Sequence, residues 1–182
     1  MLFITTTRLI PDLLSGHGDI AVGNLTITSG RQRHVDFADP FYTGISEILV
    51  TAPNSPVIQE MTDLCGKTLY VRRSSSYFES LQAVNRRFQA EGRKPITVIT
   101  VNEILEDEDI LEMMNANIIP MTVIDSHKAQ FWKNVFRHLS FHDRIIFREN
   151  AEIAWAVRKN SPRLKARINA FKKTHEQGTL MG

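Results

Sequence analysis

Short apolar runs alternate with segments of helical periodicity along the chain. The runs are rich in Val, Ile and Leu and are bounded by Gly, Pro, Asn or Asp, which is typical of buried strands. The expected strands are 19–23, 46–52, 68–71, 95–101, 121–124, 145–147 and 153–157. Because strands and helices alternate, the pattern predicts an α/β fold.

The clearest expected helix begins at Ser76, where Ser76 and Glu79 have the spacing of a capping box. Its apolar stripe consists of Tyr77, Leu81, Val84 and Phe88. Other helices are expected over 9–15, from an Asn102 cap to Met114, and after a Ser126 cap. A last helix opens at Ser161-Pro162, and its expected buried face is Leu164, Ile168 and Phe171.

The order of elements fits two α/β lobes joined by strands. A strand, a loop and a strand come first, a block of helices and strands follows, and two strands and a helix close the chain. We expect the connecting segments near 46–52 and 147–153. The predicted lobe 1 is therefore 1–47 with 149–182, and the predicted lobe 2 is 48–148.

Composition excludes several classes of protein. The 182 residues carry 22 basic and 20 acidic side chains, a formal net charge of +2, with no long basic block, so no nucleic-acid partner is expected. The single cysteine, Cys65, allows no intrachain disulfide. No apolar run approaches the roughly 18 residues of a membrane span. The opening residues lack the basic region and cleavage site of a signal peptide.

The loop 24–31 is the first candidate site, because it directly follows a buried strand. Ligands of open α/β sheets bind beyond the carboxyl ends of strands. Arg31 offers a charge-assisted fork for a carboxylate, and the hydroxyls of Thr26 and Thr28 add donors. The alternative is a surface turn with a solvated Arg31.

Two further groups follow strands of the second lobe. Arg72, Ser75 and Ser76 lie at a helix N-terminus, which is a ready anion site, although helix capping alone also explains the serines. Asp125 ends a buried strand beside a helix start, where it can receive an ammonium group or act as a second cap. Together these groups suggest a zwitterionic ligand, such as a free amino acid or a peptide terminus.

Catalytic and metal chemistry find little support. His138 and His142 are four residues apart, but no third ligand is evident and the segment is not clearly helical. No nucleophile elbow or phosphate-binding loop is present. The acidic run 106–109 is expected to be a solvated helix face. We therefore expect no catalytic residue, no metal and no cofactor.

Three motifs in order resemble extracellular solute-binding proteins of family 3. They are Gly16-His17-Gly18-Asp19, then Thr26-Ile27-Thr28 with Arg31, then Phe37-Ala38-Asp39-Pro40-Phe41-Tyr42. Ala38 and Phe41 are mild departures from the usual third motif. Further segments (71–77, 106–109, 123–127 and 154–162) resemble the branch in which this domain is joined to a membrane-bound lytic murein transglycosylase.

The resemblance implies a type II periplasmic-binding-protein fold that captures a small ligand by closure of two lobes. It implies that Thr26 and Arg31 hold the ligand carboxylate, that Asn24 takes the place of a backbone-contacting glycine, and that Asp125 holds the ammonium. Arg72, Ser75 and Ser76 correspond to the second-lobe contacts.

It also implies a periplasmic, non-catalytic module that binds an amino acid or cell-wall peptide and regulates a transglycosylase. Alternatives are the amino-acid-binding component of an ABC transporter and a degenerate structural module. The chain departs from the family by lacking its first lobe-1 strand, so we expect lobe 1 to be truncated with an exposed sheet edge that permits a homodimer. Association with the outer membrane would need other segments.

Overall fold

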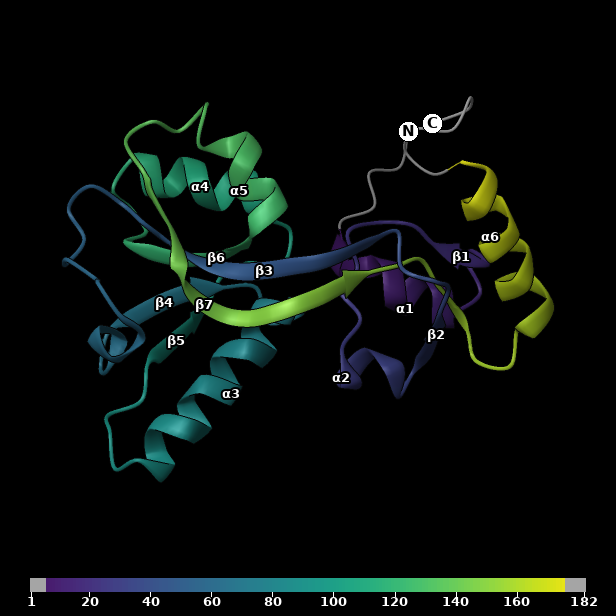
Figure 1. Ribbon diagram of the computed structural model, residues 1–182, viewed down its shortest axis with the longest axis horizontal. Coiled ribbons are helices and arrows are strands. Elements are labelled where there is room, and N and C mark those ends of the chain that lie inside the picture. The colour runs from purple at the N-terminus through teal and green to yellow at the C-terminus, as the bar shows by residue number, and fades with distance from the viewer. Residues whose placement is uncertain (1–5, 176–182) are drawn as a thin grey trace. The chain divides into compact units, whose positions relative to one another are not determined.

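Figure 1 shows a computed structural model of the chain, which describes residues 6–175. The chain divides into two compact units, unit 1 (Met1–Gly44 with Ala151–Gly182) and unit 2 (Ile45–Asn150). Two strands, β3 (Tyr42–Thr51) and β7 (Ser140–Ile153), each pass from one unit to the other. The lobe bounds expected from the sequence stay a prediction.

Unit 1 has a small antiparallel sheet in the order β1-β8-β2. Its elements are η1 (Thr6–Arg8), α1 (Leu9–Leu14), β1 (Ile20–Ala21), α2 (Ser29–Gln32), β2 (Val35–Phe37), β8 (Ala156–Arg158) and α6 (Pro162–Thr174). Leu13 of α1 packs with Val35 and Ala156 in one core, and Ile168 of α6 packs with Val157 in another. Alternate residues of the short strands therefore serve two cores.

Unit 2 contains a three-stranded sheet in the order β6-β3-β7 and a parallel pair β4-β5. Its remaining elements are η2 (Met61–Leu64), β4 (Thr68–Val71), α3 (Ser76–Ala90), β5 (Thr97–Thr100), α4 (Asp107–Asn115), β6 (Met121–Asp125) and α5 (Ser126–Trp132). Figure 1 shows α3 on one side of the sheet and α4 and α5 on the other.

Both faces of β6 and of the part of β3 from Glu47 onward are largely buried, which explains the apolar run Ile48-Leu49-Val50 and the apolar residues of β6. Leu49 and Val123 pack against α3, whereas Ile48, Val50 and Ile124 pack against α4 and α5. Fully burying one such side chain contributes about 1.5–3 kcal/mol, so the two cores fix the strand register. That register places Glu47 of β3 opposite Asp125 of β6.

The two late strands were predicted with wrong bounds. β7 is one strand of 14 residues rather than separate runs at 145–147 and 153–157, and β8 follows it. The polar residues Glu149 and Asn150 interrupt the apolar signal inside β7, and Asn150 has φ of 52°. The short strand β2 is not among the expected strands, since none was expected between 19–23 and 46–52.

The N-caps of α3, α4 and α5 all differ from the predicted residues, those of α3 and α4 as follows. The N-cap of α3 is Ser75, whose hydroxyl accepts a hydrogen bond from the Phe78 amide, and Ser76 is the first helical residue. The cap of α4 is Glu106, which forms a capping box with Asp109, so Asn102 lies outside the helix.

The last two helices also differ from the prediction. Asp125 stands at the N-cap position of α5, while the Ser126 hydroxyl accepts from the Ser46 amide. In α6 Ile168 is buried as expected, but Phe171 is exposed.

Candidate ligand-binding site

The predicted lobe-1 residues gather around the start of α2. Thr28 is the N-cap, and its hydroxyl accepts a hydrogen bond from the Arg31 amide at 3.2 Å. The Arg31 guanidinium donates through Nη1 to the Thr26 carbonyl at 2.8 Å. Thr26 is buried and Arg31 half-buried. The local fold thus holds the guanidinium of Arg31 against the loop, with Asn24 exposed two residues before Thr26.

The predicted lobe-2 residues belong to a network of ionised side chains inside unit 2. Arg72, directly after β4, donates from Nη1 to Glu106 and from Nη2 to Asp107, each at 2.5 Å. Arg72 is buried, and burial opposes its charge, but attraction to Asp107 and Glu106 prevails and raises the pKa of its guanidinium. Both terminal nitrogens of Arg72 are therefore engaged within the protein.

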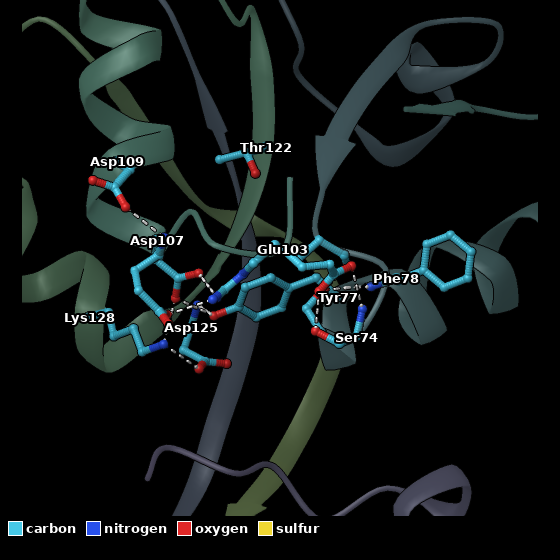
Figure 2. Close-up of polar contacts among 12 residues, drawn as sticks. Ser74, Tyr77, Phe78, Glu103, Asp107, Asp109, Thr122, Asp125 and Lys128 are labelled. Carbon is cyan, nitrogen blue, oxygen red and sulfur yellow. Dashed lines mark hydrogen bonds and ion pairs between the residues drawn. The ribbon is translucent and has the colours of Figure 1, made fainter. Parts of the chain in front are cut away.

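Asp107, the first residue of α4, is the centre of this network. Figure 2 shows Lys128, Tyr77 and Asp125 gathered around it. Lys128 Nζ lies 2.5 Å from Asp107 Oδ2, and the Tyr77 hydroxyl donates to the same oxygen at 3.2 Å. Burial alone would raise the pKa of Asp107, but the charges of Lys128 and Arg72 outweigh it and hold this pKa below its usual value. Asp107 is consequently ionised, and its charge is fully compensated.

Asp125, the last residue of β6, is compensated poorly. Its side chain is 2% exposed. Lys128 Nζ is 3.7 Å from Oδ2, and Oδ1 is buried without a hydrogen-bond partner among the described residues. Burial, with repulsion from Asp107, raises the pKa of Asp125 despite the attraction of Lys128. The backbone amide of Asp125 donates to the Tyr77 hydroxyl at 3.2 Å.

The serines that follow Arg72 have structural partners. The Ser75 hydroxyl donates to the Arg72 carbonyl at 2.7 Å and caps α3. Ser76 is buried at the first helical position, and the Ser80 hydroxyl accepts a hydrogen bond from Arg148 Nε at 3.0 Å. The structure therefore links Arg72 to Ser75 directly and to Asp125 through Asp107 and Lys128, all within unit 2.

Several residues of this network were missed by sequence reasoning. They are Glu47, Tyr77, Glu106, Asp107, Lys128 and Arg148. Asp107 is buried, so the expectation of a solvated acidic face at 106–109 was wrong at that position. The i, i+3 spacing of Asp125 and Lys128 was a usable signal. The contacts of Arg72 with α4 join residues more than thirty positions apart, which no local pattern reveals.

Unit 1 also has a surface hollow of about 270 Å³ beside the edge strand β2. Its lining includes Asp36 and Lys159, whose side chains pair with each other at 2.7 Å. This pairing lowers the pKa of Asp36. Since these charges are already matched, the hollow is a weaker candidate for a charged ligand than the surroundings of Asp125.

The chain has the fold of a type II periplasmic binding protein. It consists of two α/β units that are connected by two strands, and polar groups follow the strands of each unit. The family model for bacterial extracellular solute-binding proteins, family 3, matches residues 2–181. The chain belongs to this family, and the resemblance seen in its sequence motifs is confirmed.

Curated relatives are named membrane-bound lytic murein transglycosylase F. The protein of Desulfosudis oleivorans is 30% identical over 175 residues, which is 94% of this chain and 36% of that protein. The protein of Saccharophagus degradans is 28% identical over 142 residues, 76% of this chain and 26% of that protein. The chain thus spans about a third of the length of these relatives, or less.

Among solved structures, the substrate-binding protein of an amino acid ABC transporter matches with a TM-score of 0.78 and 21% identity, over 97% of this chain and 73% of that one. At this identity the likeness establishes the fold alone. Among the described residues, no helix has the length and apolar character that crossing a membrane requires.

Proposed function

We propose that the chain is a non-catalytic, periplasmic solute-binding module that captures an amino-acid-like ligand or a cell-wall peptide by lobe closure. In this proposal it is the regulatory domain of a lytic murein transglycosylase. The observation that carries the proposal is the buried Oδ1 of Asp125, which has no hydrogen-bond partner in the described part of the chain.

The charges around Asp125 call for one more cation. Arg72 and Lys128 supply two positive charges, whereas Glu106, Asp107 and Asp125 supply three negative ones. A buried carboxylate without a full set of partners destabilises the folded protein, unless a ligand provides the missing donor. The ammonium group of an amino acid or of a peptide N-terminus has the required charge and three N–H donors.

In this proposal, Arg31 of unit 1 is the receptor for the ligand carboxylate. Arg31 is held in place by its hydrogen bond to the Thr26 carbonyl and by the capped start of α2. A guanidinium fixed in this way loses little side-chain entropy when it binds a carboxylate. An anion receptor in unit 1 and a cation receptor in unit 2 suit a zwitterion.

The role in a transglycosylase rests on the relatives that carry that name and match nearly the whole chain. The likeness to the binding protein of an amino acid ABC transporter supports a second candidate, delivery of an amino acid to a permease. The two differ in what accompanies the domain, since the first requires a transglycosylase domain on the same polypeptide and the second a permease encoded nearby.

The test is a thermal-shift screen of the chain against free amino acids and muropeptide fragments. A ligand at about 100 times its Kd adds about 2.7 kcal/mol of stability. For a domain of this size, that raises the melting temperature by roughly 5–10 °C. The Arg31→Ala variant is expected to lose this shift while keeping the melting temperature of the ligand-free protein.

An unchanged shift in Arg31→Ala would reject Arg31 as the carboxylate receptor. A folded wild-type protein that responds to no compound would favour a degenerate structural module. Partnership with the outer membrane and homodimer formation through the β1 edge stay predictions. Exposed Leu14, Ile20 and Val22 at or near that edge support the dimer.

A further inference from the structure

A second guanidinium in unit 2 is held rigidly while its terminal groups stay available. Arg148 of β7 donates through Nε to the Ser80 hydroxyl at 3.0 Å, and the same Nε lies 3.3 Å from Glu47 Oε1. Neither of its terminal nitrogens contacts a hydrogen-bond or ion-pair partner among the described residues. The Arg148 side chain is 27% exposed, so solvent or a ligand reaches it.

The group that holds Arg148 is itself costly to bury. Glu47 is 0% exposed and lies between β6 and β7 on the central strand of the sheet. Burial raises the pKa of Glu47, and the neighbouring hydroxyls of Ser80 and Ser76 and the charge of Arg148 only partly oppose this rise. Neither carboxylate oxygen of Glu47 has a hydrogen-bond partner with good geometry among the described residues. A hydrophobic residue at this position would pack more favourably. The burial of Glu47 is therefore best explained by the orientation that it gives to Arg148.

The contrast with Arg72 identifies which guanidinium suits an external anion. Arg72 uses both terminal nitrogens on Glu106 and Asp107. Arg148 uses only Nε, which leaves the two parallel donors that form bidentate bonds with a carboxylate. Ser80 and Glu47 fix the plane of this fork before any ligand binds, which lowers the entropic cost of binding.

We infer that Arg148 is a ligand-contacting specificity residue, oriented by Glu47 and Ser80, that binds a second carboxylate on the ligand. This inference rests on the proposed function, in which Asp125 binds the ammonium and Arg31 the first carboxylate. The ligand class is thereby narrowed to zwitterions with an additional carboxylate, such as a dicarboxylic amino acid or a peptide with an acidic side chain.

The test compares ligands that differ only in this group. Calorimetric titration with glutamate against glutamine, and aspartate against asparagine, measures the preference for acid over amide. The wild-type protein is expected to bind at least one acid about tenfold or more tightly than its amide, as a charge-assisted hydrogen bond implies. Arg148→Met removes the preference and leaves amide binding within about twofold.

The matched control is Arg144→Met, which removes an exposed arginine from the same strand and is expected to keep the preference. Arg148→Lys retains the positive charge but lacks the two parallel donors of the guanidinium, so it is expected to keep only part of the preference for acid over amide. Should Arg148→Met fold poorly, the Glu47→Gln/Arg148→Met double variant removes the buried carboxylate together with its partner.

Three results are decisive. A preference that survives in Arg148→Met, or a wild-type protein that binds amide and acid equally, overturns the role of Arg148 and leaves the proposed function standing. A protein that binds neither member of either pair, and no muropeptide in the thermal-shift screen, overturns both.

Discussion

Replacing Asp125 by Asn separates the stability of the free protein from its ability to bind. The substitution keeps the shape of the side chain and removes its charge. In the free protein the Asp125 side chain is 2% exposed and its Oδ2 lies 3.7 Å from Lys128 Nζ, while Oδ1 has no hydrogen-bond partner within residues 6–175. Lys128 keeps its closer contact with Asp107 at 2.5 Å, so the variant leaves no cation unpaired.

The expected effect on the free protein is stabilising. A buried acceptor without a partner costs about 1–3 kcal/mol, and the amide of asparagine recovers part of this. We therefore expect Asp125→Asn to raise the free energy of unfolding at neutral pH by about 1 kcal/mol, which corresponds to roughly 2–4 °C in melting temperature. In the presence of ligand the sign reverses, because the stabilisation by the bound ammonium is lost.

The pH dependence gives a second measure of the same charge. The pKa of Asp125 is raised in the folded state, so the folded protein takes up this proton before the unfolded chain does. The contribution of Asp125 to stability therefore improves as the pH falls from neutral toward about 4. Asp125→Asn lacks this contribution, so its advantage over the wild type shrinks over that range.

Urea denaturation at two pH values, with and without ligand, measures all three effects. Asp143→Asn, an exposed acid of the same unit, serves as the matched control and is expected to change neither stability nor binding. The reasoning is refuted if Asp125→Asn destabilises the free protein by about 3–5 kcal/mol, the cost of breaking a buried ion pair. Retention of ligand affinity would equally refute it.

Other variants test the remaining parts of the structure. Ser75→Ala should lower the free energy of unfolding by about 1 kcal/mol in urea denaturation, because α3 loses its N-cap; no change would contradict the cap. Asp107→Asn should destabilise by about 3–5 kcal/mol at neutral pH, since it breaks the buried pairs with Arg72 and Lys128. Because the pKa of Asp107 is lowered in the folded state, its contribution to stability should begin to decline as the pH falls below about 4; a deficit at pH 2 equal to that at neutral pH would contradict it. If β1 forms a homodimer, Ile20→Lys should shift the mass measured by light scattering to that of a monomer, and a wild-type protein that is monomeric at every concentration removes the proposal.

The fold class was predictable because it depends on apolar patterning. The apolar runs 48–50 and 121–124 predict strands that are buried on both faces. The structure has a hydrophobic core on each face of the sheet, which explains these runs. The stripe of α3 likewise gave the buried face of that helix, with Leu81 and Phe88 at its centre.

Helix starts were predicted less well, because several residues near each start compete for the cap. Three consecutive serines, Ser74 to Ser76, lie at the start of α3, and only backbone geometry decides that Ser75 is extended and Ser76 helical. Near α4, Asn102 accepts from the Ile104 amide in a local turn, which leaves Glu106 to cap the helix. The side-chain chemistry of both alternatives is satisfactory, so sequence alone does not choose between them.

The chemistry of the candidate site was only partly predictable for a different reason. Arg72 and Asp125 could be found from the sequence because each is a charged residue at the end of an expected strand. The resemblance of the surrounding motifs to a known family also pointed to them. Whether such a group is available to a ligand depends on partners from distant elements. Arg72 is engaged by α4, and Arg148 is oriented by β3 and α3. These contacts arise only from the packing of the whole unit.

The distribution of these charges bears on whether the module binds a ligand or serves only as structure. In a purely structural domain, buried charges are tolerated when each is paired, as Arg72 is with Glu106 and Asp107. Asp125 and Glu47 lie opposite each other on neighbouring strands, both with raised pKa values, and their compensation is incomplete. Apolar residues at both positions would give a more stable sheet. Two such carboxylates, near a guanidinium whose terminal nitrogens have no partner among the described residues, therefore favour the proposed binding role over a purely structural one.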